Sequence, residues 1–400
     1  MILASLFFYG WWNPFYLILI IGSVCGNFVF GNWLKKHPSK SLLALTIGLN
    51  LGLIAYYKYL GFFSGIYSSI AGELVSIPDI LLPLGISFFT FQQITYLVDS
   101  YKSSTAPHGF LEYALFVTFF PQLVAGPIVH QAEILPQFAG LDRGIKAENM
   151  AMGISVFILG LFKKVVIADQ LSNYVSPMFE AAKRGEPISF LEAWGGSLGY
   201  TFQLYFDFSG YSDMAIGLAL VFGIRLPINF NSPYRALSII DFWRRWHITL
   251  SRFLREYLYI PLGGNRRGTF RRYINVLIVM VLGGLWHGAS WTFLWWGFLH
   301  GFYLTINYLW RDLKKKLGIK NKSSSYFLRS LSWVITFLAV VIGWVFFRAE
   351  NWDAAANIIS GMSGLNGRFV VTPGYLPFLE PFSAVFGPIT VSKTPLLYFD

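Results

Sequence analysis

The sequence predicts an all-α, polytopic integral membrane protein, and its composition is the first reason. Hydrophobic residues make up 55% of the 400 residues, charged residues only 13%, and the mean hydropathy is +0.52. An average soluble domain carries about 25% charged residues. The 19% aromatic content excludes intrinsic disorder, which requires few aromatics and high charge.

The spacing of the charges is the second reason. Uncharged runs that reach or approach the roughly 20 residues of a membrane helix occupy 3–34, 41–57, 80–98, 113–132, 273–310 and 330–347. The run 273–310 is long enough for two crossings. Shorter apolar pieces at 149–162, 193–206 and 214–224 are expected to be re-entrant or protein-buried. We expect about 9–11 spanning or half-spanning helices in one domain, residues 1–400, because we find no internal repeat or linker.

The net charge of +11 fits a membrane topology. Cytoplasmic loops carry excess Lys and Arg, and the segment 311–329 holds seven basic residues and one acid. This predicts contact with membrane lipid and no nucleic-acid partner. The helix expected at 330–347 would carry the tail from Glu350 to the extracytoplasmic side. A single cysteine, Cys25, excludes an internal disulfide framework and multi-cysteine metal sites.

Two carboxylates lie among aromatic residues in an apolar stretch, Asp207 and Asp213. Ionisable groups at membrane depth are functional candidates, so both are candidate binding residues. The alternative is structural: a polar network between helices, or a helix break with capping near Ser209 and Gly210.

An arginine-rich segment follows at 235–272, with nine arginines, two acids and no lysine. Helical spacing places Asp241 one turn from the arginines at 244 and 245, which predicts a helix there. The arginine fork favours phosphate. The ligand is either a lipid headgroup or the phosphates of an acyl donor such as a coenzyme A derivative. The four candidate anchors are Arg244, Arg245, Arg266 and Arg267.

A histidine lies within the longest uncharged run. His287 follows Arg272 by 15 residues, about 22 Å along a helix, and the surrounding glycines allow close backbone or substrate approach. A neutral imidazole is a suitable base near pH 7. His247, beside the arginines, is the second candidate, either a site residue or an interfacial one. For His287 the alternative is a buried packing histidine, as we expect for His300.

These motifs resemble the membrane-bound O-acyltransferase family, alginate O-acetyltransferase type. The matching stretches read FFPQLVAGPI at 119–128, FSGYSDMAIG at 208–217, DFWRRWH at 241–247, YIPLGGN at 259–265 and GGLWHGA at 283–289. The resemblance implies helices around a central tunnel in a bacterial inner membrane. It implies that His287 is catalytic and that His247 is the family's second histidine. It also implies a chain that begins within the family's first helix and stops before its last ones.

The function expected from the resemblance is acetyl transfer towards hydroxyls of an extracytoplasmic polysaccharide, such as alginate in its biosynthesis. The co-substrate is acetyl-CoA or another cytosolic thioester, with no metal and no bound cofactor, and an extracytoplasmic acyltransferase is the expected partner. His287 would act as general base, with Trp286, His247 or backbone N–H groups near Gly283 and Gly288 as oxyanion donors. Alternatives are D-alanyl transfer from a carrier protein to teichoic acid, a membrane transporter, or a non-catalytic secretion scaffold.

Overall fold

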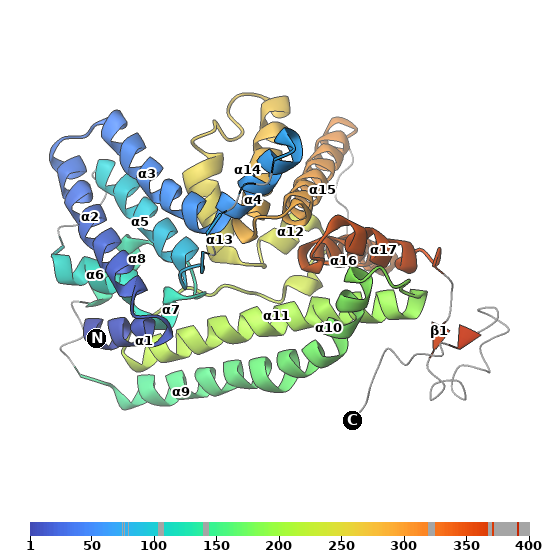
Figure 1. Cartoon of the computed structure of the whole chain (residues 1–400), viewed down its shortest axis with the longest axis horizontal. Helices are drawn as coiled ribbons and strands as arrows, with labels where there is room; N and C mark the ends of the chain where they lie inside the picture. Colours follow the sequence, from blue (N-terminus) through green and yellow to red (C-terminus); the bar gives the residue numbers. More distant parts are fainter. Residues whose placement is uncertain are drawn as a thin grey trace. The chain divides into compact units, whose positions relative to one another are not determined.

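The computed structural model describes residues 1–366 except 74, 76, 79, 103–107, 139–143 and 319–324, together with two short strands. The elements follow the chain from blue to red in Figure 1. The helices before residue 190 are α1 (Ile2–Trp12), α2 (Tyr16–Lys36), α3 (Lys40–Ile54), α4 (Leu60–Ala71), α5 (Ile86–Tyr101), α6 (Phe110–Thr118), α7 (Phe120–Leu123), α8 (Gln131–Phe138), α9 (Ala147–Phe162) and α10 (Asp169–Lys183).

The later helices carry most of the motifs. They are α11 (Phe190–Val221), α12 (Ile239–Trp243), α13 (Ile248–Leu254), α14 (Thr269–His287), α15 (Trp291–Lys316), α16 (Tyr326–Arg348) and α17 (Trp352–Met362). Short π-helical turns lie at Ala55–Tyr59, Lys163–Ala168 and Arg255–Tyr259, and a 3₁₀ turn at Pro233–Arg235. The strands β1 (Val370–Val371) and β2 (Thr390–Val391) pair in parallel. The rest of the tail beyond residue 366, predicted to be extracytoplasmic, lies outside the described residues.

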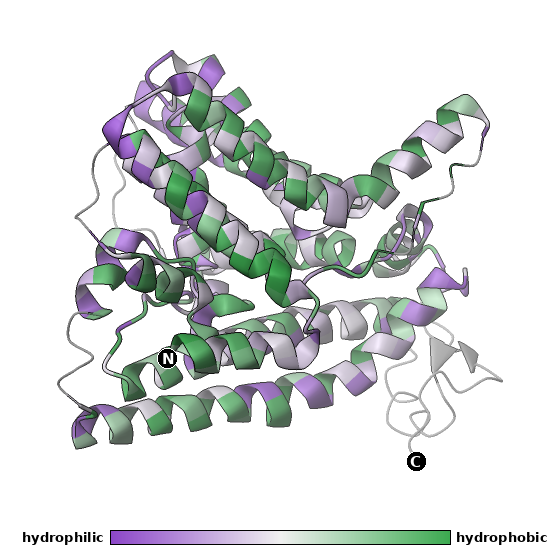
Figure 2. Ribbon diagram, turned by 60° about the vertical axis from the view of Figure 1, so that its left-hand side comes forward, coloured by the Kyte–Doolittle hydropathy of each residue, from purple (hydrophilic) through white to green (hydrophobic). Residues whose placement is uncertain are grey.

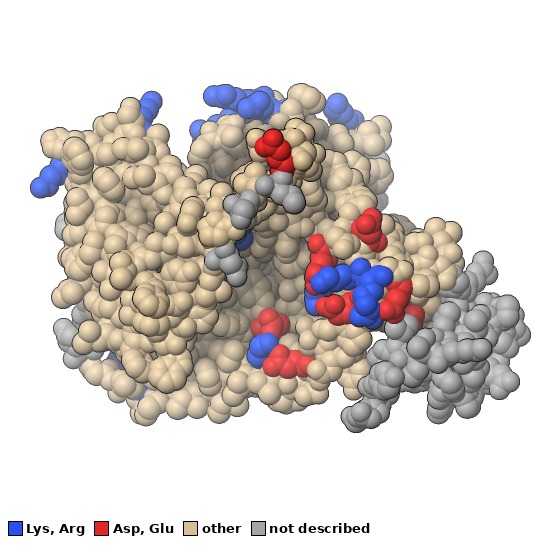
Figure 3. All heavy atoms as spheres, viewed as in Figure 1, with Lys and Arg blue, Asp and Glu red and all other residues tan. Residues whose placement is uncertain are grey.

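The predicted all-α membrane class is confirmed. Within the described residues, four helical stretches are long and apolar enough to cross a bilayer: Tyr16–Lys36, Lys40–Ala71, Ala147–Lys183 and Tyr326–Arg348. Most of the face in Figure 3 carries no charged side chain, as a lipid-facing surface requires. The predicted total of 9–11 helices includes half-spanning ones and stays a prediction.

The three predicted short pieces are parts of longer helices, so their interpretation as separate short helices is wrong. The piece 149–162 continues through a π-helical turn into α10, and Figure 2 shows this stretch mostly hydrophobic along α9 and more hydrophilic along α10. The pieces 193–206 and 214–224 lie mainly in the single helix α11. Charges at 207 and 213 divided the sequence pattern, but a helix closes its backbone hydrogen bonds regardless of side-chain charge.

The expected helix break near Ser209 and Gly210 is also wrong, because α11 runs through both residues. Gly210 instead serves helix packing. A Cβ on Gly160 of α9 would lie 2.6 Å from the Gly210 carbonyl oxygen, and one on Gly153 would lie 2.6 Å from that of Gly217. Small residues at these positions let α9 and α11 pack backbone to backbone.

The chain forms two compact units that interleave along the sequence. The first comprises Met1–Leu161, Gly210–Asn229 and His247–Tyr257, and the second Phe162–Ser209, Phe230–Trp246 and Leu258–Asp400. Each has its own apolar core. The division into one domain therefore stays a prediction.

A buried amide network joins α2, α3 and α5 in the first unit. Asn27 and Asn50 exchange hydrogen bonds of 3.2 and 2.7 Å through their side-chain amides, and Asn27 also donates to Gln93 Oε1 at 2.7 Å. Buried amides in membrane helices are stable only when paired, so this network fixes how the three helices pack.

Candidate functional site

The arginine-rich motif 241–247 does not form one helix. It bends between α12 and α13, and His247 lies at the bend with φ 43°, one of two positive-φ non-glycine residues among those described. The helix predicted around Asp241 ends at Trp243, so that prediction is wrong for Arg244 and Arg245. A left-handed conformation at a non-glycine residue costs about 1–2 kcal/mol and requires support from its surroundings.

That support comes from Asn229. The His247 ring donates from Nδ1 to Asn229 Oδ1 at 3.0 Å, and Thr249 Oγ1 donates to the same oxygen at 3.0 Å. The Ile248 amide donates to the Asn229 carbonyl oxygen at 2.9 Å. Since a neutral amide oxygen only accepts, Nδ1 carries the proton and Nε2 is the unprotonated nitrogen.

Three motif segments meet at this asparagine in the first unit. The Ile128 amide, from the motif 119–128, donates to Thr249 Oγ1 at 3.0 Å. Asn229 Nδ2 donates to Ser212 Oγ at 3.3 Å, beside Asp213 in the motif 208–217. Sequence reasoning missed Asn229 because a single amide in an apolar stretch has no periodic signal.

His247 lies outside the four candidate membrane spans and is 1% exposed. Burial lowers its pKa to about 3, because the charged imidazolium loses its hydration. His247 therefore remains neutral over the whole working range of pH.

His287 has a different environment in the second unit. It is the last residue of α14 and is half-buried, and Gly288 after it is extended. Three rings contact the imidazole edge to face: Trp286, Trp296 and Phe347, with centroids 4.8, 5.2 and 5.0 Å away. Arg272 lies on the same helix, as predicted, and the uncharged run 273–310 does form two helices.

Glycines hold α14 against α15. A Cβ on Gly284 would collide with the carbonyl oxygen of Phe293, and one on Gly297 would collide with that of Met280. The expectation that glycines near His287 permit close backbone approach is confirmed, and α15 is the helix that approaches.

The predicted anchors differ in their availability. Arg245 is half-buried and pairs with Asp241 through Nε at 2.9 Å, and it also donates to the Asn231 carbonyl oxygen at 3.3 Å. The i,i+4 contact is as predicted. Arg244 is exposed. Arg245 is thus held by the fold, whereas Arg244 is accessible to a ligand.

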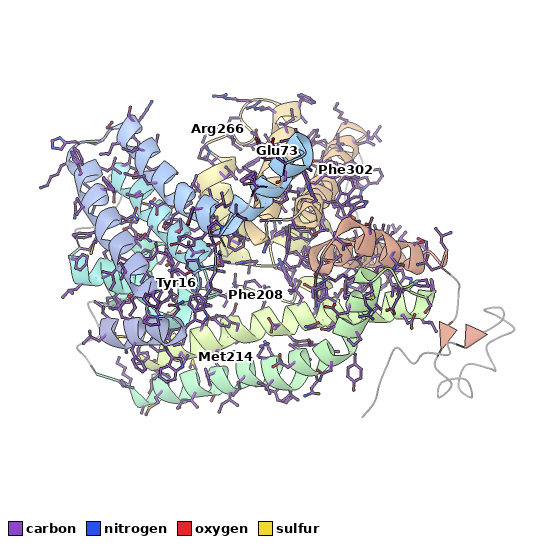
Figure 4. The ribbon with its side chains drawn as sticks, in the orientation of Figure 1. Tyr16, Glu73, Phe208, Met214, Arg266 and Phe302 are labelled. Carbon is purple, nitrogen blue, oxygen red and sulfur yellow. The ribbon has the colours of Figure 1, made fainter. Side chains whose placement is uncertain are left out.

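Arg266 and Arg267 are exposed on the loop before α14. Figure 3 shows basic side chains gathered at the end of the second unit where Figure 4 labels Arg266. Gly263 and Gly264 have φ of 103° and 53°, and buried Asn275 donates to the Gly264 carbonyl oxygen at 3.0 Å. The loop is therefore a fixed turn presenting two guanidinium groups.

The carboxylate of Asp207 is paired with a lysine. Lys164 Nζ lies 2.6 Å from Asp207 Oδ1 and 2.6 Å from Asp169 Oδ1. Lys164 belongs to the π-helical turn Lys163–Ala168, and Asp207 lies one residue before Phe208 of α11, which Figure 4 labels. The pair joins α11 to this turn, which supports the structural interpretation of Asp207.

No group of three or more His, Cys, Asp or Glu side chains suited to a metal ion occurs within the described residues. The sites of interest are two imidazoles, an arginine loop and paired carboxylates. These groups alone do not define the class of enzyme. The family to which the chain belongs does.

The chain belongs to the membrane-bound O-acyltransferase family, whose model matches residues 84–348. It is therefore an O-acyltransferase and a multi-pass protein of the bacterial inner membrane, and the transporter and scaffold alternatives are set aside. The chain is 47% identical to a peptidoglycan O-acetyltransferase of Helicobacter pylori over 399 residues, covering 92% of this chain and 74% of that protein.

Two further relatives define the range of similarity. A probable alginate O-acetylase AlgI of Pseudomonas aeruginosa is 42% identical over 90% of this chain and 69% of its own length. A teichoic acid D-alanyltransferase of Streptococcus thermophilus is 28% identical over 66% of this chain and 68% of its own. The similarity is thus greater to O-acetyltransferases than to the D-alanyltransferase.

Proposed function

We propose that the protein moves an acetyl group from a cytosolic thioester towards hydroxyls of a cell-envelope polysaccharide, with His287 as general base. The observation that carries this is the half-buried imidazole of His287 at the end of α14, held by three aromatic rings. A base that acts on substrate must be both accessible and fixed in orientation, and His287 meets both requirements.

The chemistry follows from the weakness of an alcohol as a nucleophile. His287 takes the hydroxyl proton as the oxygen bonds to the thioester carbonyl carbon. The tetrahedral oxyanion then collapses, the C–S bond breaks, and the proton passes from His287 to the leaving sulfur. A positioned base supplies typically ~10²–10⁴-fold of the rate. Oxyanion donors would come from Trp286 or backbone N–H groups beside His287.

The donor side is assigned to the arginine loop. Arg266 and Arg267 are exposed on a glycine turn held by Asn275, and guanidinium groups bind phosphate in bidentate geometry. Arg244 is the accessible anchor in the other motif, whereas Arg245 is paired with Asp241. The phosphates of acetyl-CoA and lipid headgroups compete for the same groups.

The acceptor is proposed to be peptidoglycan or another envelope polysaccharide. The 47% identical relative is named for peptidoglycan and relatives near 42% for alginate. An extracytoplasmic partner acyltransferase would complete the transfer. D-alanyl transfer to teichoic acid is the second candidate, although the relatives named for it are only 27–28% identical.

The test is mass analysis of cell-surface polymer from cells that make wild-type protein, His287→Gln, or His37→Gln. His37 is exposed after α2 and provides the same chemical change as a matched control. We expect polymer O-acetylation to disappear in His287→Gln alone. Unchanged acetylation in that variant would remove His287 from catalysis.

The donor is identified separately, with purified full-chain protein offered acetyl-CoA or a D-alanyl-loaded carrier protein. Acyl transfer from acetyl-CoA supports the proposal. Transfer from the carrier protein alone overturns it in favour of the D-alanyl alternative.

A further inference from the structure

His300 is a second buried histidine in the unit that contains His287. It lies on α15, one turn after Trp296, and is 0% exposed. The indole Nε1 of Trp243 donates to His300 Nδ1 at 3.3 Å. This bond links α12, in the motif 241–247, to α15.

The hydrogen bond fixes the tautomer of His300. An indole N–H is a donor only, so Nδ1 must be unprotonated and accept. In the neutral ring the proton then lies on Nε2. That nitrogen has no hydrogen-bond partner among the residues that the structure describes. Gly343 makes room for it, since a Cβ there would lie 2.8 Å from Nε2.

An imidazole in this position is costly compared with a hydrocarbon ring. A buried donor without a partner destabilises the folded protein, and phenylalanine would fill similar space without that penalty. The property that distinguishes the imidazole here is its accepting Nδ1, which holds the Trp243 indole. Packing alone therefore does not explain a histidine at position 300, whereas its hydrogen bond with Trp243 does.

The held indole belongs to the ring cluster around His287. Trp243 and His300 both contact Trp296, with centroids 5.9 and 4.9 Å away. Trp296 in turn meets the His287 ring nearly perpendicularly, at 5.2 Å and 87°. Trp296 thus lies between His287 and the Trp243–His300 pair, and a shift of the pair is transmitted through one ring.

We propose that His300 is a positioning residue: its Nδ1 anchors Trp243, and the pair fixes Trp296 against the His287 imidazole. The inference rests on the proposed role of His287 as base. A displacement of about 1 Å in a reacting group costs up to ~10²-fold in rate, so a loosened ring contact at His287 has a measurable effect on kcat.

The kinetic test compares His300→Asn with His300→Gln. The Asn amide places its oxygen near Nδ1 and can accept from Trp243, whereas the Gln amide reaches the Nε2 position. With purified full-chain enzyme and acetyl-CoA, we expect His300→Asn within about threefold of wild type and His300→Gln about tenfold lower in kcat with unchanged donor KM.

Trp243→Phe removes the donor side of the same bond. We expect a similar loss in kcat, and no further loss when it is combined with His300→Gln, because both changes break one interaction. Losses that multiply, or equal kinetics for His300→Asn and His300→Gln, would overturn the proposal. Thermal unfolding of each variant separates misfolding from misplacement.

A spectroscopic measurement distinguishes this proposal from the proposed function. In protein labelled with ¹⁵N at tryptophan indoles, the resonance that disappears in Trp243→Phe should move in His300→Gln and stay in His300→Asn. If it moves but kcat does not change, positioning is refuted. If instead His287→Gln retains full activity, the base assignment fails while the Trp243–His300 bond stands.

Discussion

The two motif histidines are held by opposite means. His247 is fully buried and is fixed by hydrogen bonds around Asn229, with a strained backbone and a strongly lowered pKa. His287 is half-buried and is fixed by aromatic rings at a helix end. Hydrogen bonds to a ring nitrogen specify the tautomer, whereas edge-to-face ring contacts fix the plane of the imidazole.

The difference suggests a division of roles. The His247 arrangement ties three motif segments together within the first unit, and the His287 arrangement orients an accessible imidazole within the second. Substitutions at these residues and at the charged groups test that division.

Substituting His287 should give the largest effect. For His287→Gln we expect kcat for acetyl transfer to fall ~10²–10⁴-fold, the range that a positioned base supplies, with little change in thermal stability. Steady-state kinetics on purified protein measures it. A fall in kcat of less than about threefold would mean that His287 is a packing residue and not the catalytic base.

Removing the hydrogen-bond hub should act mainly on stability. Asn229→Ala leaves His247 Nδ1 and Thr249 Oγ1 without their shared acceptor, which we expect to lower the free energy of unfolding by about 1–3 kcal/mol. Thermal unfolding measures it, with Asn265→Ala, at an exposed position, as control. Equal stability of the two variants would show that the hydrogen bonds to Asn229 do not stabilise the fold.

The low pKa of His247 has a consequence for pH. The folded protein keeps His247 neutral down to about pH 3, whereas the unfolded chain takes up a proton below about 6.5. Stability from this group is present above pH 6.5 and is lost as pH falls towards 3. His247→Asn should flatten that part of a stability-against-pH curve, and an unchanged slope would refute the burial effect.

Neutralising the arginine loop should give a smaller, separable effect. For the double variant Arg266→Gln/Arg267→Gln we expect the KM for acetyl-CoA to rise about tenfold, since each charged hydrogen bond contributes a modest share, while kcat stays near wild type. Raised salt should mimic it. Arg184→Gln, on a different part of the second unit, serves as control.

The smallest effect is expected at Asp207. Its pair with Lys164 is nearly half exposed, and such pairs contribute about 0–1 kcal/mol. Asp207→Asn should therefore shift thermal unfolding slightly and leave kcat unchanged. A tenfold fall in activity at unchanged stability would show that Asp207 binds substrate, instead of only joining α11 to the turn that carries Lys164.

The sequence predicted the helical membrane class, the two helices in 273–310 and the glycine contact near His287, because apolar length and small residues are local signals. It failed where tertiary contacts override them. Isolated charges at 207 and 213 suggested separate short helices, yet α11 runs through both, because a helix closes its backbone hydrogen bonds regardless of side-chain charge.

The site showed the same limit. Charge pairing predicted a helix around Asp241, Arg244 and Arg245, but α12 ends at Trp243. The chain bends at His247, where Asn229 stabilises the left-handed backbone through hydrogen bonds. Neither Asn229 nor Trp296 carried a sequence signal, since their roles consist of contacts made only after folding. His287 was found because its glycine-flanked motif is itself the signal.

The glycine contact between α14 and α15 makes the chain sensitive to a single carbon atom. Gly284 lies three residues before His287, and its missing side chain is the space that the Phe293 carbonyl occupies. A methyl group there would push α14 and α15 apart and displace the His287 imidazole at the end of α14. No polar group of the protein would be changed.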